Sequence, residues 1–232
     1  MEIKPIARFR SPFPTKFGIP RQAGLASGLR GRIVFEPEFR SAEAVRGLEG
    51  FDYLWLIWEF SEAQVDEKVF KATVRPPRLG DNERVGVFAS RSPFRPNRLG
   101  LSSVRILSID LEAKGADGKP SGPVIEVSGA DLMDGTPIYD IKPYLSYVDS
   151  HPEARGGFTD DHEWQRLQVA ISDEYAAWFD AADLQVLKQV LSLDPRPHYH
   201  HDDAREYGMP FKGCDIRFKV SEGVLYVTSI ER

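Results

Sequence analysis

Residues 51–60 read FDYLWLIWEF, a short run dominated by aromatic and aliphatic side chains. Its central part, Tyr53 to Trp58, is the longest such run in the chain. A membrane span needs about 20 apolar residues, so this run is far too short to be one. A short run of this composition predicts a β-strand, and the fold class then depends on what surrounds that strand.

The segments around this strand have the same character. Residues 3–9, 31–36, 85–89, 101–111 and 124–127 are also short, rich in β-branched or aromatic residues, and bounded by Gly, Pro, Asn or Asp. Many short strands with turns between them predict a β-barrel or a β-sandwich. The alternation of strands and helices that a Rossmann sheet needs is missing, as is a GxGxxG motif. A short helix is predicted over residues 41–48, with Ser41 as its N-cap.

The pattern changes after a polar, glycine-containing stretch, residues 149–163, which predicts a linker. Beyond it we expect a small α+β domain over residues 164–232, after a main domain over residues 1–148. Strands are expected at residues 164–171, 214–220 and 224–230, and helices at residues 173–181, capped by Ser172, and 183–193.

The composition limits the kind of protein. With 232 residues and 41% hydrophobic content, the chain can bury a substantial core. The single cysteine, Cys214, excludes an internal disulfide, and we expect it to be a small buried residue. The N-terminus has no apolar signal segment, so we expect a soluble, cytoplasmic protein.

Charge is distributed unevenly along the chain. Residues 1–105 carry 18 Lys and Arg against 12 Asp and Glu, a net of +6, whereas residues 106–232 carry 12 against 23, a net of −11. The two halves sum to the overall −5. Such asymmetry points to a polyanionic partner for the basic half.

Much of the positive charge lies in residues 75–100, RPPRLGDNERVGVFASRSPFRPNRLG. Four prolines and three glycines prevent this segment from being one helix or one long strand, so it predicts a stiff loop. The planar guanidinium group suits phosphate or carboxylate. The segment holds six arginines: Arg75, Arg78, Arg84, Arg91, Arg95 and Arg98.

Six segments carry a family resemblance, and they keep their order over nearly the whole chain. They are RSPFPTKFGIPRQAGL (10–25), AVRGLEGFDYLWLIW (44–58), TVRPPRLG (73–80), VGVFASRSPFRPNRLGLS (85–102), DLMDGTPIYDIKPYL (131–145) and DPRPHYHHDDAREYGMPFKGCDIRF (194–218). Together they resemble the TsaA-like family. Its members are S-adenosylmethionine-dependent tRNA methyltransferases that methylate the exocyclic nitrogen of threonylcarbamoyl-adenosine beside the anticodon.

The resemblance implies a mainly β fold, with an N-terminal β-barrel that binds S-adenosylmethionine and a small C-terminal domain that helps to hold tRNA. It also implies a homodimer. The chain departs from some relatives at Ser61-Glu62, where they have His-Gln, and at Arg98-Leu99, where Pro-Ile is common. The implied donor-binding positions are Pro20, Arg21, Gln22, Ser61, Glu62, Arg91, Leu101, Asp134, Gly135, Thr136 and Pro137.

The chemistry of the donor supports some of these roles. S-adenosylmethionine carries a cationic sulfonium, an ammonium and a carboxylate, so its site needs an acid and a cation. Asp134 or Glu62 suits the cationic end, and Arg21 or Arg91 suits the carboxylate. Several arginines around one sulfonium would repel it, so most should face RNA phosphates. We therefore expect RNA contacts from Arg75, Arg78, Arg95, Asn97 and Arg98, with Arg95 and Asn97 gripping the threonine carboxylate of the modified nucleotide.

The acceptor nitrogen poses a separate problem, because its lone pair is delocalised as in a urea. Either a base removes the N–H, or the site stabilises the developing anion while it holds donor and acceptor in line. The candidate bases are Asp134, Asp140 and Tyr144. Each has a structural alternative: a turn cap for Asp134, an ion pair with Lys142 for Asp140, and a core phenol for Tyr144.

Two rival functions stay open from the residues. One is a non-catalytic RNA-binding or regulatory module that holds S-adenosylmethionine as an effector. The other is a metal-dependent hydrolase built on Asp131, Asp134 and the histidines of residues 198–201. We expect no metal, because aspartates beside a Gly-Pro turn are typical turn caps and the HxHH spacing lacks a helical i, i+4 pair.

Overall fold

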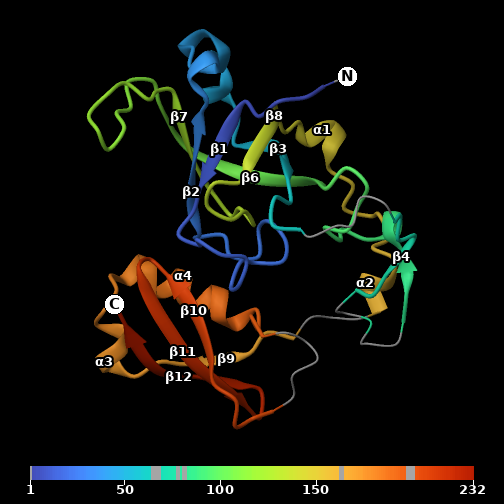
Figure 1. The fold of residues 1–232 in the computed structure, drawn as a ribbon, viewed down its shortest axis with the longest axis vertical. Coiled ribbons are helices and arrows are strands. Elements are labelled where there is room, and N and C mark those ends of the chain that lie inside the picture. The colour runs from blue at the N-terminus through green and yellow to red at the C-terminus, as the bar shows by residue number, and fades with distance from the viewer. Residues whose placement is uncertain (1, 64–68, 77–78, 80–82, 162–164, 197–201) are drawn as a thin grey trace.

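The computed structural model describes residues 2–63, 69–76, 79, 83–161, 165–196 and 202–232. Figure 1 shows a β-barrel in the upper part of the molecule and a separate C-terminal sheet with helices below it. The predicted mainly β fold, with an N-terminal barrel and a small α+β domain, is confirmed. Within the described ranges, no helix has the length and apolar character needed to cross a membrane.

The barrel closes through six strands, and antiparallel pairs connect each to its neighbours. The central strand β3 (Tyr53–Glu59) alternates in burial, because successive side chains of a strand point to opposite faces. Its inward residues Leu54, Leu56 and Trp58 are at most 5% exposed and fill the barrel interior. Around the barrel the order is β1 (Ala7–Arg10), β2 (Arg30–Phe35), β7 (Val124–Ser128), β6 (Leu99–Asp110), β3 and β8 (Pro137–Pro143).

Three predictions for the N-terminal part were wrong in detail. Residues 41–48 form no α-helix but a 3₁₀ turn, Ala42–Val45, before a second turn at Leu48–Gly50. The helical path ends at Arg46, whose ψ is 128°, and Gly47 after it has φ +87° and begins the second turn; the Ser41 side chain makes no capping hydrogen bond. The strand expected at residues 85–89 is only β5 (Val85–Gly86), followed by a 3₁₀ turn, and it pairs with β4 (Thr73–Val74). β8 was missed, since prolines begin and end it and charged side chains occupy its outer face.

The C-terminal sheet has the order β10 (Tyr207–Phe211), β11 (Cys214–Ser221), β12 (Val224–Glu231) and β9 (Gln168–Ala170), with β9 parallel to β12. The two closing strands were predicted correctly, and Cys214 is buried as expected. β10 was missed because Gly208 and Pro210 interrupt its strand pattern. The strand expected at residues 164–171 shortens to β9, and Trp164 lies outside the described residues.

Helices cover one face of this sheet. Ser172 caps α3 (Asp173–Ala176) by accepting the N–H of Tyr175, as predicted, but this helix ends five residues early. The second helix, α4 (Ala181–Ser192), begins two residues before its predicted start because Asp180 caps it. The stretch predicted as a linker contains the end of α1 (Ser146–Asp149) and all of α2 (Phe158–Asp161).

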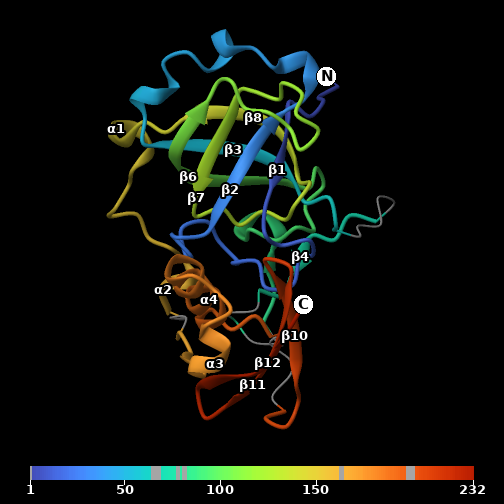
Figure 2. The same cartoon turned by 90° about the vertical axis from the view of Figure 1, so that its left-hand side faces the viewer.

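Residues 11–29, called here the β1–β2 connection, lie between the barrel and the C-terminal domain (Figure 2). Phe13, Ala26 and Leu29 are at most 4% exposed, and they belong to the same apolar cluster as α4 and the C-terminal sheet. The ring of Phe13 lies 5.9 Å from that of Phe211 in β10. The core of the C-terminal domain is therefore completed by residues from the other end of the chain.

Candidate functional site

The predicted donor-binding residues come from loops that meet at one end of the barrel. β1, β3 and β7 end there, and β2, β6 and β8 begin there, as their antiparallel registers require. This end, called here the loop end, faces the C-terminal domain (Figure 1). It gathers the β1–β2 connection, the long connection from β3 to β6 and the turn before β8.

Asp131 joins these loops. Its carboxylate accepts a hydrogen bond of 2.6 Å from Ser102 Oγ, and Trp58 Nε1 donates to that same hydroxyl at 2.9 Å. The carboxylate also accepts the backbone N–H of Ala23 and feels the charge of Arg91. Burial raises the pKa of Asp131 above its ordinary value, although these hydrogen bonds and Arg91 oppose the shift. The loop end is thus built around a partly buried acid.

The sequence suggested Asp131 only as a turn cap or a metal ligand and did not predict its place at the loop end. Its position offered a signal. Asp131 follows the buried strand β7 through Gly129 and Ala130, and Leu132 after it is also buried. A single acid between apolar neighbours at the end of a buried strand is a candidate functional carboxylate.

Pro20, Arg21 and Gln22, which are predicted to bind the donor, lie on the β1–β2 connection. Gln22 Oε1 accepts a hydrogen bond of 2.7 Å from Arg91 Nη1, so the structure brings these two predicted donor residues together. Arg21 Nη2 donates to the backbone oxygen of Arg196 at 3.3 Å. Burial lowers the pKa of Arg21, and the nearby charge of Asp194 partly offsets that effect. Arg21 therefore spans from the barrel to the C-terminal domain.

The other predicted donor positions lie near the same end but differ in exposure. Ser61 and Glu62 are exposed in the turn after β3. The Leu101 side chain is 58% exposed on the outer face of β6, while its neighbours Gly100 and Ser102 are buried. A Cβ atom on Gly100 would overlap the ring of Trp58, so this strand needs glycine to pass the tryptophan.

The turn before β8 is tied down by its own contacts. Asp134 Oδ1 accepts the backbone N–H of Ser11 at 3.0 Å, and Oδ2 pairs with Arg10 at 3.4 Å. Gly135 has φ +78° and donates its N–H to Phe9 O at 2.8 Å. Thr136 and Pro137 are buried beside them. Asp134 therefore acts as a cap that fixes this turn to the end of β1.

The three candidate bases do not come together. Asp140 pairs with Lys142 at 2.8 Å along β8. Tyr144 follows the far end of β8, and its ring packs against Tyr53 at 6.2 Å and Trp55 at 5.6 Å. With about 3.3 Å per residue, the six steps from Pro137 to Pro143 put roughly 20 Å between the two ends of β8. The structural alternatives describe the contacts of Asp134 and Asp140, whereas Tyr144 is only partly buried and lies outside both apolar clusters, so it is not a core phenol.

The arginines of residues 75–100 contact the protein more than the sequence suggested. Arg84 Nε donates to Thr73 Oγ1 at 2.8 Å, and Arg95 Nη1 donates to Ser90 O at 2.8 Å and to Val87 O at 3.2 Å. Arg75 and Asn97 are exposed, and Arg78 lies outside the described residues.

Arg98 also turns inward. Its side chain is 30% exposed and pairs with Glu59 at 3.3 Å, and Glu59 also accepts a hydrogen bond of 2.6 Å from Tyr139. This hydrogen bond raises the pKa of Tyr139. The φ of Arg98 is +49°, an uncommon value for a residue other than glycine. Its ion pair thus fixes the end of the β3–β6 connection to β3.

An exposed aromatic cluster lies beside these arginines, and sequence reasoning missed it. It consists of Phe70 and Phe88, which are 60% and 69% exposed. The rings of Phe70 and Phe88 stack with centroids 6.2 Å apart. Arg95 lies over the ring of Phe88 at 5.6 Å. Exposed aromatic side chains that stack on one another are a candidate interaction surface.

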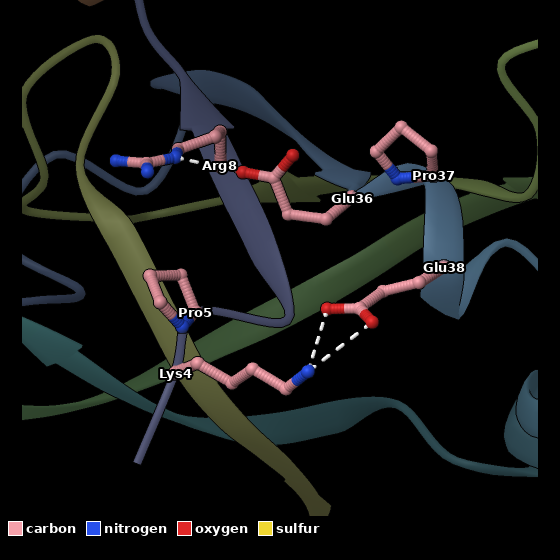
Figure 3. A pocket seen from close by; sticks show the side chains of 6 residues that line it. All are labelled: Lys4, Pro5, Arg8, Glu36, Pro37 and Glu38. Atoms are coloured by element: carbon pink, nitrogen blue, oxygen red, sulfur yellow. Dashed lines mark hydrogen bonds and ion pairs between the residues drawn. The ribbon is translucent and has the colours of Figure 1, made fainter. Parts of the chain in front are cut away.

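A hollow of about 370 Å³ lies at the far end of β1 and β2, away from the loop end (Figure 3). Its charged side chains already pair, Lys4 with Glu38 at 3.0 Å and Arg8 with Glu36 at 2.9 Å. Over the described ranges, no group of three or more His, Cys, Asp or Glu side chains could hold a metal ion. The histidines at residues 198, 200 and 201 lie outside those ranges.

Family models and relatives match this architecture. Residues 8–150 match the tRNA-methyltransferase O N-terminal domain, and residues 164–232 match the TrmO C-terminal domain. A tRNA (adenine(37)-N6)-methyltransferase of Escherichia coli K12 is 32% identical over 238 residues, covering 99% of this chain and 97% of the relative. A Pseudomonas aeruginosa protein described as a putative S-adenosylmethionine-dependent methyltransferase, RcsF, is 37% identical, covering 93% of this chain and 91% of the relative.

Solved structures agree over the full length. A crystal structure of TrmO superposes with a TM-score of 0.78 at 30% identity, covering 100% of this chain and 99% of that one. TrmO from Pseudomonas aeruginosa superposes with a TM-score of 0.77 at 29% identity and 98% coverage of that chain. The barrel, the C-terminal domain and the order of the sequence segments all match, and the chain belongs to the TrmO family of tRNA methyltransferases.

Proposed function

We propose that this protein is an S-adenosylmethionine-dependent tRNA methyltransferase that methylates the exocyclic nitrogen of threonylcarbamoyl-adenosine next to the anticodon. The observation that carries the proposal is the loop end, where the partly buried acid Asp131 lies beside the Arg91–Gln22 pair. Full-length relatives described as tRNA (adenine(37)-N6)-methyltransferases support the reaction and the position.

The loop end offers both charges that S-adenosylmethionine requires. Arg91 and Arg21 suit its carboxylate, and Asp131 is the acid best placed to face its cationic groups, because burial strengthens charge interactions. Pro20, Gln22 and the turn of Asp134–Pro137 would shape the remaining wall. When bound, the donor supplies a methyl group activated by the positive sulfonium.

The residues support catalysis by positioning rather than by a dedicated base. Asp134, Asp140 and Tyr144 are engaged in a turn cap, an ion pair and ring packing. The loop end can instead hold donor and acceptor in line, while Arg91 stabilises negative charge as it develops on the carbamoyl group. A basic role for Asp134 stays a prediction.

RNA is proposed to approach over the arginine-rich loop. Exposed Arg75 and Asn97 suit phosphate and nucleotide contacts, and Arg78 keeps that predicted role. The internal contacts of Arg95 and Arg98 support a role in shaping the loop that presents the modified nucleotide. We keep the division into a barrel domain over residues 1–148, a linker over residues 149–163 and a C-terminal domain that assists tRNA binding.

A homodimer is proposed through the exposed aromatic cluster, because burying these side chains against a second copy would remove apolar surface from water. The cytoplasm is the proposed compartment, because tRNA is the substrate. The reaction needs no metal in this proposal.

The test is direct. The protein and methyl donor are incubated with tRNA that carries or lacks the threonylcarbamoyl group, and digested nucleosides are analysed by mass spectrometry. The expected result is one added methyl group on threonylcarbamoyl-adenosine, with none on unmodified tRNA. Donor binding without product would favour the regulatory module, and activity lost on chelation would favour the hydrolase.

A further inference from the structure

The C-terminal domain holds the β1–β2 connection through polar contacts as well as through its core. Gln189 Oε1 of α4 accepts the backbone N–H of Gly28 at 3.3 Å, and Arg166 donates to Leu25 O at 3.2 Å. Apolar residues of the same connection pack into the cluster that contains Leu187. The connection that carries the proposed donor loop is therefore seated on the C-terminal domain along much of its length (Figures 1 and 2).

Arg21 makes the most specific of these contacts. It reaches the turn after α4, where its Nη2 donates to Arg196 O at 3.3 Å. Asp194 in the same turn attracts its charge. A partly desolvated guanidinium needs such partners, because removing its hydration without replacing it is unfavourable. Arg21 is thus oriented by the C-terminal domain, whereas its neighbour Gln22 is oriented by Arg91 of the barrel.

The turn that receives Arg21 is built to hold one shape. Asp194 accepts two hydrogen bonds from the Arg196 guanidinium, at 2.8 Å and 2.9 Å, and a third from the Arg196 backbone N–H at 3.3 Å. The two side chains are only 19% and 14% exposed, so solvent screens the pair weakly. Asp194 itself has φ +52°, and its side-chain contacts hold the turn in this left-handed conformation.

We propose that Asp194 and Arg196 are positioning residues for Arg21, so that the C-terminal domain forms part of the methyl-donor site. The inference rests on the proposed function, in which Arg21 contacts S-adenosylmethionine. The Arg196 carbonyl and the Asp194 charge fix the direction of the Arg21 guanidinium, and the barrel alone supplies neither.

The test uses the full chain with Asp194→Asn, which removes the charge with little change in size. Titration calorimetry without tRNA is expected to give about 5- to 20-fold weaker binding of S-adenosylmethionine, the loss typical of one charge-assisted contact. The KM for the donor should rise by the same factor. The kcat at saturating donor and the affinity for donor-free tRNA should change by less than about 2-fold, since no reacting atom is touched.

Asp183→Asn is the matched control. Asp183 lies on α4 in the same domain and pairs with Lys212, so its loss removes an ion pair remote from Arg21. Donor affinity in this variant should equal that of the unmodified protein. An equal loss of donor affinity in both variants would show that the substitutions destabilise the domain as a whole, and it would overturn the proposal.

A double-mutant cycle identifies the route of the effect. Arg21→Met alone should weaken donor binding, and adding Asp194→Asn to it should cost less than about a further 2-fold, because the group being positioned is gone. The positioning role would be overturned if the two substitutions weakened donor binding independently, so that their fold-losses multiplied in the double variant. A loss of tRNA affinity with unchanged donor affinity would also overturn it. If the unmodified protein binds no S-adenosylmethionine, the proposed function itself fails.

Discussion

The close packing of Gly18 against Met209 gives a test of the contact between the C-terminal domain and the β1–β2 connection. A Cβ atom built on Gly18 would overlap Sδ and Cγ of Met209, which is fully buried in β10. Gly18 also has φ +87°, where a side chain costs about 1–2 kcal/mol. Gly24 shares this conformation, with φ +82°, but has open space around its Cβ position. Gly24→Ala should therefore lower the free energy of unfolding only by this backbone cost. Gly18→Ala should lower it by roughly 1–3 kcal/mol more, because its methyl group overpacks against Met209.

The assay is urea unfolding followed by tryptophan fluorescence and circular dichroism, with the free energy of unfolding obtained by linear extrapolation. Met209→Ala provides the check on the cause. It should cost about 2–5 kcal/mol in the unmodified protein and about 1–3 kcal/mol less in the Gly18→Ala background, because it removes the overlapping atoms. Equal losses for the two glycine variants, or additive effects of Gly18→Ala and Met209→Ala, would refute this account of the interface.

Three further predictions concern the loop end and its surroundings. Burial raises the pKa of Asp131, so its contribution to stability is complete below the unfolded pKa and is lost as pH rises through the folded pKa. The Tm of Asp131→Asn relative to that of the unmodified protein should therefore be higher at pH 7 than at pH 4. The affinity of this variant for S-adenosylmethionine should fall about 10-fold. Arg95→Ala removes the contacts that shape the 87–90 turn, so it should raise the donor KM as well as weaken tRNA binding, whereas Arg75→Ala should reduce only tRNA affinity and its salt dependence. Phe88→Asp should convert the proposed dimer to a monomer in analytical ultracentrifugation, and Tyr147→Asp, at another exposed aromatic residue, should not.

The strand pattern was readable from the sequence where one face of a strand fills the barrel. In β3, inward Leu54, Leu56 and Trp58 repeat every second residue, which a sheet requires. β8 and β10 were hidden because Pro137, Pro143 and Pro210 resemble breakers, and their place in a sheet depends on partners far away in the chain. The helix predicted at residues 41–48 shortens to Ala42–Val45, because Arg46 after it already has an extended ψ of 128°.

The candidate site was predicted as a set of loops but not as a set of contacts. The resemblance pointed to Gln22 and Arg91, and the structure brings them within 2.7 Å. The inward role of Arg95 was unforeseeable, because it depends on where two backbone carbonyls point after folding. The hydrogen bonds that Asp131 accepts from Ala23 and Ser102 likewise depend on segments that only folding brings to it.

The shared core also limits when the β1–β2 connection can fold during translation. Phe13 and Phe211 pack together although 198 positions separate them in the chain. At about 5–20 residues per second, roughly 10 to 40 seconds of translation pass between them. During that interval the apolar side chains of the β1–β2 connection have no partner domain to cover them. The β1–β2 connection can therefore complete this packing only after the C-terminal strands have been synthesised.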